Sequence, residues 1–128
     1  WALAQQFHYP YAAANGAEVL NKELVVASQP FSEEAEMFRS IRSRLIEPSG
    51  SNQGSHGRAI AVVSPNTGDG KSFFAANLAV VFSQLAGRTL LLDADMRTPR
   101  QHEIFDIESS AGLSGILSGR SGTNVIRP

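Results

Sequence analysis

The chain has 128 residues, of which 42% are hydrophobic and 18% charged, so its composition is typical of one small globular domain with its own core. Its net charge of -1 provides no overall attraction to nucleic acid, and we expect no nucleic-acid partner. The absence of cysteine excludes a disulfide scaffold and thiolate metal sites. No apolar run approaches the roughly 18 residues that span a bilayer, so any membrane association is expected to come through a partner.

The chain is expected to divide into three parts. Residues 1–23 are interpreted as the tail of an N-terminal helical domain with its linker, because an initial helical stretch is broken at Pro10. Residues 24–57 are predicted to hold one helix and a flexible linker rich in Gly and Ser. Residues 58–128 are predicted to be the N-terminal part of an α/β domain, and we interpret the chain as a piece of a longer protein.

The helix in the second part is expected over about residues 32–47, where Pro48 would end it. Ser32 is a suitable N-cap, and the acidic Glu33 and Glu34 match the positive end of the helix dipole. Four apolar residues at helical spacing are predicted to form its buried stripe, and these are Met37, Phe38, Ile41 and Leu45.

The third part is expected to open with a βαβ unit. The runs AIAVVS at 59–64 and TLLLDAD at 89–95 are typical of strands buried on both faces. Residues 71–86 have helical periodicity, and Gly87 is a suitable residue after the helix end. This order indicates parallel strands with a right-handed crossover. The predicted fold class is therefore α/β, a parallel sheet with flanking helices that is incomplete here. Short helices are expected in QHEIFD and GLSGILSG.

The turn SPNTGDGKS, which begins at Ser64, has the composition of a phosphate-binding loop. Gly68 and Gly70 permit positive φ, which lets successive backbone N–H groups point into one cavity at a helix N-terminus. Lys71 can then bridge the β- and γ-phosphates, and the Ser72 hydroxyl can bind Mg²⁺. The alternative is a glycine turn with a surface lysine, and the predicted strand before the turn and helix after it disfavour that alternative.

Two carboxylates follow the second predicted strand. Period-2 alternation places Asp93 and Asp95 on the same side of an extended chain, at the strand end where open α/β sheets bind ligands. Such a pair suits a magnesium site and a group that orients or deprotonates a nucleophile. The alternative is an N-cap with a surface ion pair to Arg97 or Arg100. The phosphate loop upstream favours the functional interpretation.

Residues 24–127 closely resemble the bacterial tyrosine kinases of exopolysaccharide synthesis, in particular the stand-alone chain-length-determinant kinases. The motifs that carry the resemblance are a Walker A loop ending Gly70-Lys71-Ser72, a Walker A′ motif of Asp93-x-Asp95-x-Arg97, and the downstream Pro99, His102, Phe105 and GLS at 112–114. These kinases lie within the wider MinD/ParA/Mrp P-loop ATPase class. The strict P-loop glycine is replaced by Pro65 here, and the signature lysine of that class by Asn66, which favours the kinase branch.

The resemblance implies a protein-tyrosine kinase that autophosphorylates and regulates exopolysaccharide chain length. Its cofactors would be ATP and Mg²⁺, and the implied nucleotide-binding residues are Gly68, Asp69, Gly70, Lys71, Ser72 and Phe73. Ser72 and Asp93 would hold the magnesium ion. Lys71 and Asp95 are the implied catalytic residues, and Asp95 would prepare the tyrosine hydroxyl. The Walker B aspartate and the tyrosine cluster of the family are not found in this chain, so these 128 residues alone are not expected to be active.

The predicted helix at 32–47 also carries Glu36, Arg39 and Arg42, which resemble the ring-forming E-x-x-R-x-x-R motif of the family. At 100° per residue, the three side chains are expected on the face opposite the apolar stripe, where they would meet a neighbouring subunit. The alternative is a solvated charged face with weak i,i+3 pairs.

The implied setting is the cytoplasm, peripheral to the inner membrane. The expected partners are the cytoplasmic tail of a membrane polysaccharide co-polymerase, further copies of the kinase in a ring, and tyrosine substrates that include the kinase itself. Two other functions stay open: a MinD/ParA-like ATPase switch without kinase activity, and a non-catalytic nucleotide-binding or interaction fragment.

Overall fold

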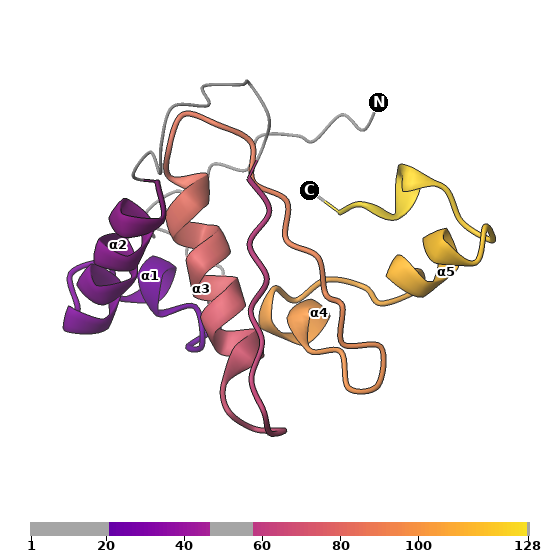
Figure 1. Ribbon diagram of the computed structural model, residues 1–128, viewed down its shortest axis with the longest axis horizontal. Coiled ribbons are helices and arrows are strands. Elements are labelled where there is room, and N and C mark those ends of the chain that lie inside the picture. Colours follow the sequence, from indigo (N-terminus) through magenta and orange to yellow (C-terminus); the bar gives the residue numbers. More distant parts are fainter. Residues whose placement is uncertain (1–20, 47–57, 128) are drawn as a thin grey trace.

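Short helical segments make up the regular structure of the part of the chain that is described, residues 21–46 and 58–127 of a computed structural model (Figure 1). In chain order they are α1 (Val25–Ser28), α2 (Glu33–Ile46), α3 (Lys71–Ser83), α4 (Gln101–Ile104), α5 (Leu113–Leu117) and a 3₁₀ helix, Thr123–Val125. Most of the predicted N-terminal tail, the predicted linker and the expected helix end at Pro48 lie outside the described residues. None of the helices in the described ranges is both long and apolar enough to cross a membrane.

Helix α2 begins where the capping pattern predicts. The Ser32 hydroxyl accepts a hydrogen bond from the backbone N–H of Ala35 at 3.2 Å, which satisfies one of the donors at the helix start. The buried side of α2 is centred on Ala35 and Phe38. Met37 is 63% exposed, so its predicted place in the buried stripe is wrong. At 100° per residue Met37 lies about 100° from Phe38, at the edge of the stripe.

Helices α1, α2 and α3 pack against one another and enclose the core (Figure 1). The Phe38 ring of α2 lies 6.1 Å from the ring of Phe73 and 5.4 Å from that of Phe74, both in the first turn of α3. The buried apolar residues of this core are Leu24, Val26, Ala27, Phe38, Ala76, Leu78, Val80, Val81 and Ile104. The helix that follows the glycine turn is therefore held along its length by apolar packing.

Two sequence predictions about this region need correction. Helix α3 ends at Ser83, three residues before the predicted end at residue 86. Gly87 does not cap it in the left-handed conformation, because the glycines with positive φ among the described residues are Gly68, Gly70 and Gly119. The short helices α4 and α5 do form within the two stretches where they were predicted.

The predicted parallel sheet is not seen in the described ranges. Residues 59–64, which precede α3 in the chain, and residues 89–95, which follow it, are irregular, and Figure 1 draws no arrow along them. The expectation that both runs are buried on two faces is wrong here, because Val63 is 83% exposed and Leu92 is 59% exposed. Parallel strands normally occur in sheets that helices cover on both faces, and two such runs alone cannot provide that arrangement.

A buried asparagine ties α1 to α3. Asn77 is fully buried, and its Oδ1 accepts a hydrogen bond from the backbone N–H of Val26 at 3.1 Å. Its Nδ2 donates to the carbonyl of Glu23 at 2.7 Å and to that of Phe73 at 3.0 Å. The amide thus pairs with a backbone N–H of α1 and with a backbone carbonyl of the preceding segment, groups that helical hydrogen bonds leave unpaired. Asn77 therefore adds three hydrogen bonds to the apolar packing that holds residues 23–26 on α3.

Replacement of Asn77 by alanine should destabilise the fold more than an ordinary polar substitution. Asn77→Ala leaves a buried donor and a buried acceptor unpaired, and we expect a loss of about 3 kcal/mol in the free energy of unfolding, measured by urea denaturation. Ser43→Ala is the matched control, since the Ser43 hydroxyl bonds only the Arg39 carbonyl on the exposed side of α2. Equal stability of the two variants would contradict the role given to Asn77.

Candidate functional site

The turn before α3 has the backbone conformation that the sequence predicts. Gly68 has a φ of +87° and Gly70 a φ of +86°, both in the left-handed region. Gly70 is also the N-cap residue of α3, so the helix starts directly from a left-handed residue. A Cβ added at either glycine would meet no atom within 4 Å, so glycine is required for its backbone conformation and the space beside it is open.

Hydrogen bonds within the turn hold it in shape. The Lys71 ammonium donates to the Ser64 hydroxyl and to the Asn66 carbonyl, both at 2.9 Å. The Ser64 hydroxyl itself donates to the Asn66 carbonyl at 3.0 Å. Asp69 closes the other side, because its Oδ2 accepts from the backbone N–H of Asn66 at 3.1 Å. The lysine therefore lies folded across the loop that its sequence motif assigns to phosphate.

The first turn of α3 supplies the remaining predicted residues. The first N–H groups of a helix have no partner within the helix, and here the first backbone bond is from Phe74 to the Gly70 carbonyl at 2.9 Å. The N–H groups of residues 71–73 therefore precede the helical hydrogen-bond pattern, where the helix dipole favours an anion. Phe73 itself packs its ring into the core, so only its backbone is suited to a ligand.

Asp93 organises the entry into α4. Its Oδ2 accepts hydrogen bonds from the backbone N–H groups of Arg100 and Gln101, both at 3.0 Å. Its Oδ1 accepts from the N–H of Asp95 at 3.1 Å. Gln101 continues the connection, because its Nε2 donates to the Ser72 carbonyl at 3.0 Å. The two predicted magnesium ligands, Ser72 and Asp93, thus both form a hydrogen bond with Gln101.

Asp95 is held by the turn that follows it. Its Oδ1 accepts from the backbone N–H groups of Arg97 at 3.1 Å and Thr98 at 3.0 Å, and its Oδ2 accepts from the Thr98 hydroxyl at 3.1 Å. The hydrogen bond from the Thr98 N–H, followed by those from the Arg97 N–H and the Thr98 hydroxyl, lowers the pKa of Asp95, and the charge of Lys71 contributes in the same direction. The carboxylate is therefore ionised at neutral pH and within electrostatic reach of the lysine.

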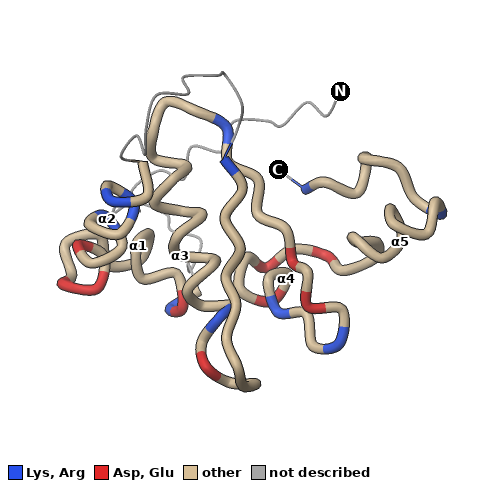
Figure 2. Tube along the Cα trace, viewed as in Figure 1, with Lys and Arg blue, Asp and Glu red and all other residues tan. Residues whose placement is uncertain are grey.

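The arrangement fits a magnesium–nucleotide group. No three His, Cys, Asp or Glu side chains in the described part of the chain lie close enough together to hold a metal ion. Mg²⁺ is usually held by one or two carboxylates together with phosphate oxygens and water, and Ser72 with Asp93 supplies donors of that kind. One buried acceptor beside them, Oε1 of Gln101, has no partner among the described atoms. Figure 2 shows charged residues gathered along the glycine turn and along the chain that leads into α4.

The predicted ring motif on α2 is placed differently from the expectation. Arg42 donates to the Val81 carbonyl of α3 at 2.9 Å, and Arg39 donates to the Pro30 carbonyl at 2.7 Å and forms an ion pair with Glu36. The three side chains do not share one outward face, because Arg42 lies only about 40° from Phe38 around a helix of 100° per residue. Glu36 is the most open of the three residues, and the ring contact stays a prediction.

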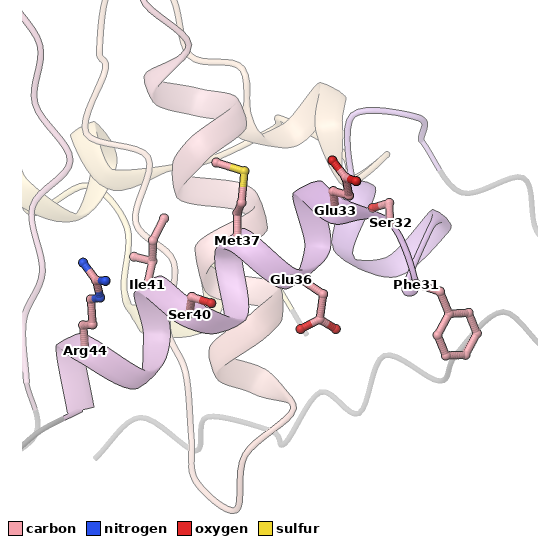
Figure 3. Close-up of a pocket in the computed structure, with 8 residues that line it drawn as sticks. All are labelled: Phe31, Ser32, Glu33, Glu36, Met37, Ser40, Ile41 and Arg44. Carbon is pink, nitrogen blue, oxygen red and sulfur yellow. The ribbon is translucent and has the colours of Figure 1, made fainter.

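An open pocket lies along α2 rather than at the glycine turn (Figure 3). Its volume is about 520 Å³, and its lining residues are Phe31, Ser32, Glu33, Glu36, Met37, Ser40, Ile41 and Arg44. It contains none of the residues predicted to bind nucleotide. We place the candidate site at the turn and not in this pocket, since a phosphate loop wraps around its ligand and needs no preformed cavity.

Two residues of the site are absent from the sequence prediction. Thr98 caps the Asp95 carboxylate, and the spacing of an aspartate three residues before a threonine is a signal that could have indicated this turn. Gln101 joins Ser72 to Asp93 across the structure, and no local pattern marks it. Its role follows only from the packing of α4 against α3.

Comparison with known proteins defines the class. Residues 60–118 match the family described as the CobQ/CobB/MinD/ParA nucleotide binding domain, and this stretch contains the glycine turn, α3 and both aspartates. That class implies an α/β P-loop fold. No solved structure matches the chain.

The relatives refine this assignment. The putative tyrosine-protein kinase CapB of Staphylococcus aureus is 36% identical over 98 residues, which cover 77% of this chain and 42% of that protein. The tyrosine-protein kinase YwqD of Bacillus subtilis is 35% identical over 107 residues, which cover 84% of this chain and 44% of that protein. The tyrosine-protein kinase wzc of Salmonella typhi is 34% identical over 98 residues, covering 77% of this chain and 13% of that protein.

The chain is thus similar over most of its length to bacterial tyrosine kinases, and residues 60–118 match the MinD/ParA-type nucleotide-binding class. The resemblance found in the sequence is therefore confirmed. The chain spans less than half the length of CapB and YwqD, and it spans about an eighth of wzc.

The lowered pKa of Asp95 should be measurable in a titration. Because the folded pKa is lowered, the hydrogen bonds stabilise the native turn above the ordinary aspartate value of 3.8 and are lost only as the pH falls through the lower folded value. We expect the Asp95 carboxyl carbon to titrate below 3.8 in an NMR experiment. Thr98→Val should move its midpoint upward, whereas Thr123→Val should not. A midpoint at or above 3.8 would contradict the observed turn.

Proposed function

We propose that this chain carries the Mg-ATP-binding part of an autophosphorylating protein-tyrosine kinase that regulates exopolysaccharide chain length and export. The observation that carries the proposal is the left-handed glycine turn with Lys71 folded across it, together with the hydrogen bonds of Gln101 that connect Ser72 with Asp93. The names of the relatives support the reaction type, since CapB, YwqD and wzc are all described as tyrosine-protein kinases.

The proposed binding site follows from the backbone. The N–H groups of residues 68–73 would surround the phosphates, and Lys71 would exchange its contacts with Ser64 and Asn66 for phosphate oxygens. Ser72 and Asp93 would hold the magnesium ion, which neutralises charge on the phosphates when it is bound.

The proposed reaction needs little from the protein beyond position and charge. The tyrosine oxygen would form a bond to the γ-phosphorus as the bond from that phosphorus to the β–γ bridging oxygen breaks and ADP leaves. Asp95 would orient the tyrosine hydroxyl and receive its proton. Its lowered pKa makes it a weak base, so we assign it orientation first and proton acceptance second.

The proposed setting is cytoplasmic, at the inner membrane. The kinase would act on tyrosines of its own chains and of other proteins. Its activator would be the cytoplasmic tail of a membrane polysaccharide co-polymerase, and its subunits would assemble into a ring through Glu36, Arg39 and Arg42. Arg39 and Arg42 form hydrogen bonds to backbone carbonyls within the chain. In a ring, each arginine would either keep that hydrogen bond or replace it by a contact with the neighbouring subunit.

The second candidate function is an ATPase switch of the MinD/ParA kind. The matched family over residues 60–118 favours it, since that family is named for such nucleotide-binding proteins. Asn66 disfavours it, because the signature lysine of the switch ATPases would fall at this position.

Loss of the loop lysine should abolish most nucleotide binding. In the full-length protein, Mg-ATP at 100 times its Kd should stabilise the fold by about 2.7 kcal/mol, seen as a rise in Tm. Lys71→Met should remove most of that rise, because the ammonium would no longer contact the phosphates. Lys22→Met is the matched control, since Lys22 is the other lysine of the chain and is exposed. A rise unchanged by Lys71→Met would place the nucleotide elsewhere.

Replacement of each aspartate by asparagine should affect nucleotide binding and tyrosine phosphorylation differently at the two positions. Asp95→Asn keeps an acceptor for the two N–H groups of its turn, so nucleotide affinity should stay within a few-fold while tyrosine phosphorylation falls by about 10²-fold or more. Asp93→Asn should weaken magnesium-dependent binding more, because an amide nitrogen would face N–H donors on one side of the group.

The assay is nucleotide titration beside phosphotyrosine detection on the same samples. Asp106→Asn is the control, because Asp106 has a φ of +52° and asparagine tolerates that conformation well. Equal loss of binding in both test variants would reject the division of roles. ATP hydrolysis by the wild type without phosphotyrosine, even with an activator tail present, would favour the ATPase switch.

A further inference from the structure

One buried polar side chain beside the site is only partly satisfied. Among the described residues, the buried polar side chains are those of Asn77 and Gln101. Asn77 has partners for both atoms of its amide. Gln101 is 9% exposed, and its Oε1 has no hydrogen-bond donor in the described structure. A buried acceptor without a partner is costly, so its presence beside a candidate site calls for a ligand.

Both N–H-bearing groups of Gln101 form hydrogen bonds with residues of the site. Its Nε2 donates to the Ser72 carbonyl at 3.0 Å, and its backbone N–H donates to Asp93 Oδ2 at 3.0 Å. The contact with a carbonyl fixes the orientation of the amide, because only the nitrogen can donate there. Oε1 is bonded to the same carbon as Nε2, so it also lies next to the first turn of α3.

The position of α4 makes this arrangement rigid. Ile104 of α4 is buried in the core, and the Asp93 carboxylate caps the N–H groups at the start of α4. Arg100, the residue before α4, forms an ion pair with Glu23 at 2.9 Å. Gln101 therefore cannot turn its amide freely toward solvent, and its free oxygen stays buried beside the nitrogen that contacts Ser72.

A magnesium ion brings the donors that such an oxygen lacks. Mg²⁺ loses its water reluctantly and usually keeps several waters when bound through one or two carboxylates and phosphates. Those waters are strong hydrogen-bond donors. Acceptors that orient the groups around a metal typically change its affinity by 10- to 100-fold when they are removed.

We propose that Gln101 is a positioning residue of the magnesium–nucleotide site, whose Oε1 accepts a hydrogen bond from a magnesium-bound water while the contact of its Nε2 with the Ser72 carbonyl fixes the orientation of its own amide. The inference rests on the proposed function, since it requires Mg-ATP at the glycine turn. It adds a residue that neither Walker motif includes, and it predicts an effect on the metal dependence of binding rather than on the phosphate contacts themselves.

The test is a titration of a fluorescent ATP analogue against the full-length protein, at a series of magnesium concentrations and in EDTA. Gln101→Met keeps the length of the side chain and removes both polar atoms. We expect the magnesium concentration at half-maximal binding to rise about tenfold or more. Affinity for the metal-free nucleotide should stay within twofold, because the N–H groups of the loop are unchanged.

Two further variants separate the possible causes. Gln84→Met makes the same replacement at the other end of α3, where Gln84 follows the last helical residue, and it should leave the magnesium midpoint unchanged. Gln101→Glu keeps oxygen acceptors but loses the donor to Ser72, so it should not raise the magnesium midpoint although it should lower the Tm of the free protein. Gln101→Glu also keeps the test valid if Gln101→Met does not fold.

The outcomes are distinct. A raised magnesium midpoint in Gln101→Met alone supports the proposal. Parallel loss of affinity with magnesium and in EDTA would overturn it, since that result shows a distorted loop rather than a lost water acceptor. An unchanged midpoint in Gln101→Met, or a tenfold rise in Gln101→Glu, would also overturn it. If the wild-type protein bound no nucleotide at all, the proposed function would fail together with this inference.

Discussion

The burial of α3 is the constraint on which the rest of the structure depends. Its apolar side chains, with Val80 and Val81 fully buried at its C-terminal half, form much of the core. Its first residue follows a left-handed glycine, so the turn that precedes it cannot move without moving the helix. Asn77 in its middle holds the chain before α2 through hydrogen bonds that no other side chain replaces. A loop that must place several N–H groups around one anion needs such an anchor.

The polar contacts around the candidate site form a continuous path. Glu23 bonds Asn77 through its carbonyl and Arg100 through its carboxylate. The N–H of Arg100 in turn bonds Asp93, which also bonds Gln101 and so connects to the first turn of α3. The segment that leads into the predicted ring helix is thereby linked to a predicted magnesium ligand. The segment before α2 and the entry into α4 are therefore held in a fixed relation by polar contacts.

Both aspartates have a structural task as well as a proposed chemical one. Asp93 caps the entry into α4, and Asp95 caps the turn at residues 97–98. A carboxylate that accepts two or three N–H bonds is fixed in orientation and stays ionised, which suits a group that must meet a metal or a hydroxyl at a defined place. The same bonds mean that removal of either side chain changes the backbone nearby. Asparagine is therefore the more informative replacement, and alanine would combine the two effects.

Local chemistry in the sequence determined the phosphate turn, the start of α2 and the existence of α3, α4 and α5. Gly68 and Gly70, the Ser32 cap and the apolar spacing each act over a few residues, so a pattern can indicate them without knowledge of the fold. The resemblance to the bacterial tyrosine kinases likewise follows from motifs within one stretch of chain. The roles of Lys71, Ser72 and the two aspartates stay predictions.

Only the tertiary structure decided which side chains lie between those elements. Arg42 was predicted to face a neighbour, but it bonds the Val81 carbonyl, because α2 packs on α3 with that side turned inward. Gln101 enters the site because α4 folds against α3, and a contact across 29 residues leaves no local signal. The apolar runs at 59–64 and 89–95 are exposed for a similar reason. An apolar pattern predicts that a strand will be buried, but burial also requires neighbouring strands and covering helices. The described part of the chain does not place such segments against these two runs.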